Sequence, residues 1–154
     1  GLARTLQAHF EEKNQTPNRL GGKRTNFWSQ ISRRTAFQSA SDDRAEVTIA
    51  DTRILPHIYG GDIEPVDADA LTIPVHPQAH GKRVSELALE LGAKLFRLPG
   101  TRVLATSIKG DLEIYYGLAS SVYIRKDPEA LPTDQTIEQQ LTETAEDYFE
   151  FELD

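Results

Sequence analysis

The chain has 154 residues, no cysteine and a net charge of −7. This length suits one domain with a core of its own, and the lack of cysteine excludes disulfides, thiol chemistry and cysteine-ligated zinc. No apolar run approaches the roughly 20 residues that a membrane-spanning helix needs.

The charges are unevenly distributed along the chain. Residues 1–53 carry nine Lys/Arg and six Asp/Glu, residues 54–126 carry eight of each, and residues 127–154 carry ten Asp/Glu and no Lys/Arg. The acidic end has two interpretations: a solvated helix, or a segment attracted to the basic front of a neighbouring copy. In either case a net acidic chain is a poor general binder of nucleic acid, since that affinity depends on neutralising phosphates.

Two helices are predicted near the start. Leu2, Leu6 and Phe10 recur every four residues and predict a helix over residues 2–13, which the turn-forming residues 14–18 end. A second helix is predicted over about residues 25–38, with Thr25 or Asn26 as its N-cap. Its expected stripe consists of Phe27, Ile31, Arg34 and Phe37. A polar turn over residues 39–43 then leads to an alternating strand over residues 44–50.

Glycine and proline divide the middle of the chain. Pro56 prevents a long helix there, and Tyr59-Gly60-Gly61 predicts a tight bend in which Tyr59 anchors the turn in the core. Residues 71–75 read as a short strand whose proline favours an edge position. A polar loop follows over residues 76–83, then a short helix over residues 84–91 that ends at Gly92.

A hairpin is the clearest signal of the second half. Strands over residues 102–108 and 111–116 flank a two-residue Lys109-Gly110 turn, and a further strand is expected over residues 121–125. Thr133 is a suitable cap for a final helix, whose apolar stripe comprises Ile137, Leu141, Ala145 and Tyr148/Phe149. The predicted fold is α+β: an antiparallel β-sheet with two N-terminal helices and a C-terminal helix.

None of the candidate catalytic groups forms a complete set. The four histidines are His9, His57, His76 and His80; the last two are four apart, but Pro77 keeps His76 outside any helix that follows, which disfavours a metal pair. Lys109, Asp111 and Glu113 resemble part of a nuclease centre and lack a further carboxylate and a base. Ser120-Ser121 has no nucleophile-elbow context. We therefore predict no catalytic, cofactor-binding or metal-binding residues.

The basic segment Gly21-Gly22-Lys23-Arg24-Thr25 is the one candidate anion site. It does not have the spacing of a phosphate-binding loop and no strand precedes it, although a helix N-terminus beside two basic residues can hold an anion. Two alternatives thus stay open. One is a nucleic-acid or phosphate-binding accessory protein using Arg19, Lys23, Arg24, Arg33 and Arg34. The other is a small metal-dependent nuclease or peptidase using His76, His80 and carboxylates.

Two segments resemble a known family. Gly60-Gly61-Asp62-Ile63-Glu64-Pro65, then Leu71-Thr72-Ile73-Pro74, is similar to the Gly-Gly-x-Ile-x-Pro and Leu-x-Ile-Pro segments of the phage virion morphogenesis family, which includes the tail-completion proteins of Mu-like phages. Residues 16–24 resemble a linker between two N-terminal helices in that family, and residues 122–124, 131 and 132 resemble its closing strand and loop. Two departures are the missing His-Gln before the aromatic residue and Arg125-Lys126-Asp127-Pro128 in place of Arg-Pro-Phe.

The resemblance implies a structural protein rather than an enzyme. It implies one tail-completion-like domain over residues 1–154, with residues 1–22 as an extended N-terminal helical arm. The protein would join or complete the tail at the virion neck or the head-proximal tail end, as a six-fold or twelve-fold ring assembled in the cytoplasm of the bacterial host. Its partners would be other copies of itself, connector or adaptor proteins, and tail-tube or tail-terminator proteins. DNA would only pass through the channel, and no membrane or cofactor would take part.

Overall fold

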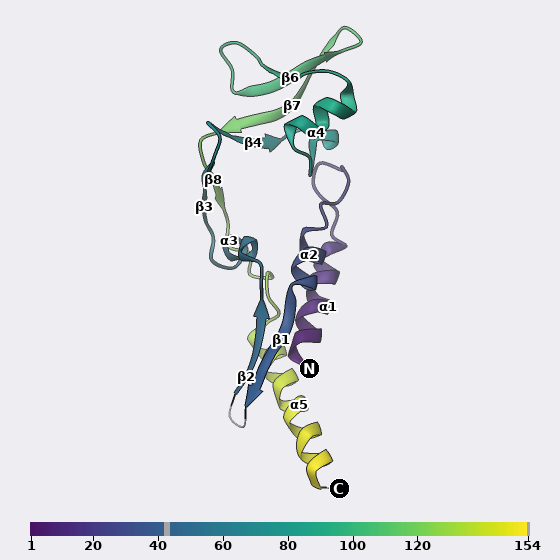
Figure 1. The fold of residues 1–154 in the computed structure, drawn as a ribbon, viewed down its shortest axis with the longest axis vertical. Coiled ribbons are helices and arrows are strands. Elements are labelled where there is room, and N and C mark those ends of the chain that lie inside the picture. The colour runs from purple at the N-terminus through teal and green to yellow at the C-terminus, as the bar shows by residue number, and fades with distance from the viewer. Residues whose placement is uncertain (42–43, 154) are drawn as a thin grey trace. The chain divides into compact units, whose positions relative to one another are not determined.

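The computed structural model describes residues 1–41 and 44–153, except that the side chains of 40, 41, 45, 148, 149 and 151–153 lie outside the described part. The chain forms two compact units (Figure 1). The first comprises residues 1–16, 26–60 and 125–154, and the second comprises residues 17–25 and 61–124. The predicted α+β class is confirmed, because helices and antiparallel strands occur together, with α1 and α2 near the start and α5 at the end.

The first unit is built on two helices and a hairpin. Helices α1 (Leu2–Asn14) and α2 (Phe27–Arg33) are followed by strands β1 (Thr35–Ser41) and β2 (Arg44–Ile49), a 3-10 turn η1 (Thr52–Ile54) and helix α3 (Leu55–Tyr59). Leu6 and Phe10 of α1 are buried against Ile31 and Ile54, and Trp28 stacks on Phe10 with ring centroids 5.9 Å apart. The four-residue spacing therefore places the apolar side chains of α1 on the one face of the helix that packs into this core.

The second helix is shorter than predicted. It ends at Arg33, and residues 35–41 form β1, in which Thr35 pairs with Ile49 and Phe37 with Val47. Phe37 is 57% exposed and does not belong to a helical stripe. The hydroxyl of Thr35 donates to the Ile31 carbonyl at 3.0 Å and so gives a partner to one of the carbonyl groups at the end of the helix. Strand pairing supplies the remaining backbone partners, so tertiary contact overrides the local helical spacing. Of the polar turn predicted over residues 39–43, residues 39–41 belong to β1 instead, and residues 42 and 43 lie outside the described residues.

The chain bends after α3 as predicted, but the side chain expected to anchor the bend is not in the core. Gly60 has φ +72°, a conformation that glycine adopts without strain, and the chain turns there. Tyr59, however, is 74% exposed, so the prediction that it anchors the turn in the core is wrong. The 3-10 turn η1 places Ile54 in the core instead, and α3 places Ile58 against it.

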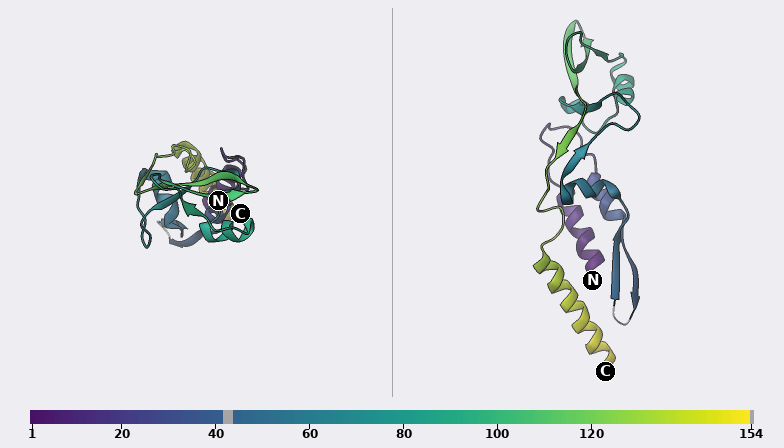
Figure 2. Two further views of the ribbon diagram at one scale, coloured as in Figure 1. Left: turned by 90° about the horizontal axis from the view of Figure 1, so that it is seen from above. Right: turned by 90° about the vertical axis from the view of Figure 1, so that its left-hand side faces the viewer.

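Helix α5 (Asp134–Leu153) completes the first unit. Thr133 caps it as predicted, since its hydroxyl oxygen accepts the Thr136 N–H at 3.2 Å. Near its start, Gln140 accepts a hydrogen bond from the Thr5 hydroxyl of α1 at 3.0 Å. Figures 1 and 2 show that α5 then runs on past the N-terminal end of α1. Residues 141–147 are all exposed, and the predicted contribution of Tyr148/Phe149 to the apolar stripe falls outside the described side chains.

The second unit contains two antiparallel sheets. Strands β3 (Gly61–Ile63) and β8 (Val122–Ile124) form one sheet. The other has the order β4-β7-β6-β5, with β4 (Leu71–Pro74), β5 (Phe96–Arg97), β6 (Val103–Ile108) and β7 (Asp111–Ala119). The strand that contains Pro74 lies at the edge, as predicted, and Lys109 and Gly110 form the β6–β7 turn with positive φ.

Helix α4 (Val84–Leu91) covers one face of the four-stranded sheet. Its Leu87 is fully buried with Ala79, Leu95, Tyr115 and Tyr116. Residues 76–83, predicted as a polar loop, contain the 3-10 turn η2 (Pro77–Ala79) and are part of this packing. The Tyr116 hydroxyl donates to the Lys82 carbonyl at 2.9 Å, so this segment does not extend away from its own unit.

Candidate functional site

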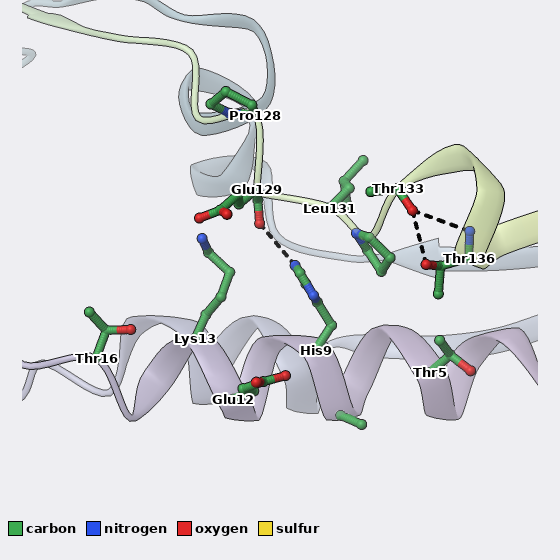
Figure 3. A pocket seen from close by; sticks show the side chains of 12 residues that line it. Thr5, His9, Glu12, Lys13, Thr16, Pro128, Glu129, Leu131, Thr133 and Thr136 are labelled. Atoms are coloured by element: carbon green, nitrogen blue, oxygen red, sulfur yellow. Dashed lines mark hydrogen bonds between the residues drawn. The ribbon is translucent and has the colours of Figure 1, made fainter.

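A groove of about 690 Å³ lies within the first unit, between α1 and the segment that leads into α5 (Figure 3). Thr5, His9, Glu12 and Lys13 lie at helical spacing along one side of α1. Together with Thr16, two residues beyond the end of the helix, they form one wall. The opposite wall contains Pro128, Glu129, Leu131, Pro132, Thr133 and Thr136, and Ala8 completes the lining. The groove is therefore polar along its helical wall and partly apolar across from it.

Two contacts join the walls. The ammonium group of Lys13 lies 2.9 Å from an Asp127 carboxylate oxygen and 4.8 Å from the centre of the Trp28 ring. The Nε2–H of His9 donates to the Glu129 carbonyl at 2.9 Å. Asp127 is fixed further by its own N–H, which donates to the His57 carbonyl at 2.7 Å, and by a carboxylate oxygen that accepts the Glu129 N–H at 2.9 Å. These bonds fix the position of residues 127–129 against α1.

The electrostatics of this region favour a charged Asp127 and a neutral His57. Burial alone would raise the pKa of Asp127, but the hydrogen bonds from Lys13 and the Glu129 N–H, with the charges of Lys13 and His57, lower it below its usual value. Burial lowers the pKa of His57; Asp127 acts against this effect, and Lys13 adds to it. Neither shift places a proton donor beside a nucleophile.

The groove is better suited to binding a ligand by its shape and its hydrogen-bonding groups than to catalysing a reaction. His9 is held by a carbonyl, Lys13 is neutralised by Asp127, and the Thr133 and Thr136 hydroxyls bond to each other at 2.9 Å. A nucleophilic site needs a hydroxyl within reach of a base that a third group orients. Among the residues that line the groove, no such set is brought together.

The two histidines chosen from the sequence, His76 and His80, are the N-cap and C-cap residues of η2. His76 caps η2 by accepting the Gln78 N–H at 3.1 Å, its Nε2 lies 3.8 Å from Glu113, and its ring lies 4.6 Å from that of Tyr115. The fold thus brings His76 to Glu113. In residues 1–41 and 44–153, no three His, Asp or Glu side chains converge as metal ligands would.

The glycine-rich segment at residues 21–25 is fastened to its own unit. The Asn18 side chain accepts the N–H groups of Leu20 and Gly22 and donates to the Gly22 carbonyl. Gly22 lies so close to the Pro77 carbonyl that a Cβ atom at this position would clash with it. The helix that follows has only seven residues, and Asn26 makes no side-chain cap bond. The glycine is therefore explained by close packing.

The basic residues of the nucleic-acid alternative are exposed and divided between the two units. Arg33 and Arg34 belong to the first unit, and Arg19, Lys23 and Arg24 to the second. Arg34 lies 3.8 Å from Asp51, which also holds Arg53 at 2.6 Å. Ser120 and Ser121 are exposed in the connection between β7 and β8.

An exposed apolar surface lies on the four-stranded sheet. Phe96 pairs with Ala105, which pairs with Ile114, and directly opposed residues share one face. Leu112 lies two residues from Ile114 on the same face. The exposed fractions are 44% for Phe96, 42% for Ile114 and 54% for Leu112. Ala105, paired with both Phe96 and Ile114, is itself buried. We call the set Phe96, Ala105, Leu112 and Ile114 the apolar sheet face.

A β-bulge places the core on the opposite face. Leu104 pairs with Tyr116 and Ala105 with Ile114, so Tyr115 is an extra residue in β7. Tyr115 and Tyr116 both enter the core under α4, and Ile114 points away from it. The carboxylate of Glu113 lies beside His76, on the side of Tyr115. Both faces of the sheet are thus apolar, and α4 covers one of them.

No protein-family model, curated protein or solved structure matches this chain. In the described residues, no helix combines the length and the apolar character needed to cross a membrane. The groove and the apolar sheet face were both missed by sequence reasoning. The spacing of Thr5, His9 and Lys13 is a signal for the helical wall, whereas Phe96 lies in a two-residue strand that has no alternating pattern.

Proposed function

We propose that the protein is a structural component of a tailed-phage virion, at the neck or the head-proximal tail end, where it joins or completes the tail as an oligomeric ring. In this role it contacts other copies of itself, a connector or adaptor protein, and a tail-tube or tail-terminator protein. It is not an enzyme, and DNA passes through the ring without being held.

The apolar sheet face is the observation that supports an assembly role. Exposed groups of large apolar side chains on a folded protein mark surfaces that bind another protein, a membrane or a ligand, and an assembly protein uses the first of these. Phe96, Leu112 and Ile114 form such a group on one face of one sheet. The groove between α1 and residues 128–136 holds its polar groups in structural bonds, which suits a scaffold better than a reaction site.

The assignment to a phage virion is supported by the resemblance of two segments. The Gly60-Gly61 part of the first segment forms the bend that leads into β3, and the second segment forms β4 at the edge of the four-stranded sheet. A bend and an edge strand need no catalytic partner. An edge strand with free backbone groups is a surface on which neighbouring chains can pair.

The proposed function is tested by the mass and the location of the protein. Native mass spectrometry of the purified chain should give six or twelve copies, and negative-stain images should show rings. A labelled chain added to purified phage heads and tails should bind at the neck or the tail end. A chain that stays monomeric at high concentration and binds neither heads nor tails would contradict the proposal.

The two alternatives have readouts of their own. A nucleic-acid or phosphate-binding protein that uses Arg19, Lys23 and Arg24 would bind DNA with an affinity that falls steeply with salt. A metal-dependent hydrolase would bind a divalent cation in a calorimetric titration and would lose activity on His76→Ala. We expect no salt-dependent binding at physiological ionic strength and no heat of metal binding.

A further inference from the structure

The side-chain hydrogen bonds of the second half of α5 lie within the helix itself, such as those that Gln139 and Gln140 each donate to Glu143 at 2.9 Å. Residues 141–147 are exposed, and Leu141 is 48% exposed. The helix carries seven acidic residues and no basic one. Glu143 and Asp147, and Glu146 and Glu150, are like charges four residues apart, which destabilise a helix. Acidic residues near its C-terminus also oppose the helix dipole, and the last turn has no basic residue.

A partner surface for this helix should offer apolar contact and little negative charge. Ile137, Leu141 and Ala145 recur every four residues along α5 and form an apolar stripe between its acidic residues. Helices too short or too charged to be stable alone gain most of their stability by packing such a stripe. The structure therefore contains an acidic amphipathic helix that is exposed over residues 141–147, where its one neighbour among the described contacts is Gly1, beside Thr144.

The apolar sheet face meets these requirements. Residues 94–118, which include β5, β6 and most of β7, carry four basic residues and two acidic ones. The acidic residues are Asp111 and Glu113, which alternate with Leu112 and Ile114 and so belong to the opposite face. The basic Arg97 alternates with Phe96 and lies on that opposite face too. Lys94 and Lys109, at the ends of this region, are exposed. The charge of this region complements that of α5.

The size of the sheet also suits one helix. Four strands about 4.8 Å apart make a face about 14 Å wide, and a helix with its side chains is about 10 Å across. On the other face, α4 already provides such a cover. A second helix on the apolar sheet face would make a three-layer arrangement.

We propose that α5 of one copy lies across the apolar sheet face of a second copy, with Leu141 against Ile114 and Leu112. This inference rests on the proposed oligomeric assembly and names the contact that forms it. In the proposed ring each copy gives its helix to one neighbour and receives a helix from the other, which is a heterologous contact that closes when its rotation divides the full turn. The negative charge of α5 favours the less acidic face of the sheet, and the apolar stripe of α5 provides the surface that is buried in the contact.

Cysteine cross-linking tests the contact directly, because the chain has no cysteine of its own. Chains with Ile114→Cys are mixed with chains with Leu141→Cys and oxidised. The expected product is a disulfide between the two kinds of chain. The control pairs Leu141→Cys with Leu89→Cys, since Leu89 is 85% exposed on α4, the helix that covers the other face. This control pair should cross-link at least about tenfold more slowly, a ratio equivalent to roughly 1.4 kcal/mol.

Charge substitutions test the choice of partner. Ile114→Glu should weaken association at least about tenfold, Ile114→Lys should weaken it less because α5 is acidic, and Leu89→Glu should leave it unchanged. Circular dichroism of each variant confirms that the exposed substitution leaves the fold intact.

Several outcomes would overturn the inference. Preferential pairing of Ile114→Cys with itself would show that two sheet faces meet. A monomer-sized cross-link in the Ile114→Cys/Leu141→Cys double variant at high dilution would show that α5 folds onto its own chain. Equal sensitivity to Glu and Lys would exclude the acidic helix. A ring that forms without the mixed disulfide refutes this contact and leaves the proposed function standing, whereas a chain that remains monomeric refutes both.

Discussion

The ion pair between Lys13 and Asp127 should control how firmly the two walls of the groove are held together. The side chains are 18% and 30% exposed, and their charged atoms are 2.9 Å apart. Exposed ion pairs contribute about 0–1 kcal/mol and loss of one partner of a buried pair costs about 3–5 kcal/mol, so this partly buried pair should have a coupling energy of about 1–2 kcal/mol. The cation–π contact with Trp28 adds about 0.5–1 kcal/mol to the effect of removing the lysine charge.

A double-mutant cycle measures this coupling. Lys13→Met keeps the apolar stem and removes the charge, while Asp127→Asn keeps an oxygen that can accept the Glu129 N–H. Urea unfolding followed by the fluorescence of Trp28, the one tryptophan of the chain, reports on the core beside the pair. The double variant should be about 1–2 kcal/mol more stable than the sum of the single effects predicts. Lys126→Met, at an exposed neighbouring lysine, should change stability by less than about 0.5 kcal/mol.

The coupling should also depend on pH in a defined direction. The pKa of Asp127 is lowered in the folded state, so its contribution is present above the usual carboxyl pKa of about 3.9 and is lost as the pH falls through the folded value. The pKa of His57 is lowered too, chiefly by burial, so its protonation destabilises the fold as the pH falls below about 6.5. A coupling energy that is zero at pH 7, or that does not shrink at low pH, would refute this account of the groove.

Three further predictions concern single positions. Gly22→Ala should destabilise the second unit by about 1–3 kcal/mol, because the new Cβ meets the Pro77 carbonyl; unchanged thermal stability would contradict that packing. Thr133→Ala should cost about 1 kcal/mol by removing the cap of α5, visible as lost helicity in circular dichroism, whereas Thr142→Ala within the helix should not. The pKa of Asp51 is lowered to about 2, by its hydrogen bond from Arg53 first, so Asp51→Asn should be most destabilising above pH 4 and progressively less so toward pH 2. A constant difference across that range, measured by urea unfolding, would count against the ion pair.

The sequence alone predicted the ends of elements that are set by residues close by in the chain. Thr133 caps α5, α4 ends at Gly92, and the Lys109-Gly110 turn joins β6 to β7. Each of these features depends on backbone preferences within a few residues, and local sequence carries that information. The placement of the Pro74 strand at a sheet edge follows equally from one missing N–H group.

The tertiary structure alone decided where the candidate surfaces lie. Residues 35–38 lie within the predicted helix and form part of β1 because β2 offers backbone partners. The bulge at Tyr115 turns two consecutive tyrosines into the core and leaves Ile114 on the apolar sheet face. Asp127 meets Lys13 across 114 residues of sequence. Such contacts depend on how distant segments pair and pack, and no short sequence window contains that information.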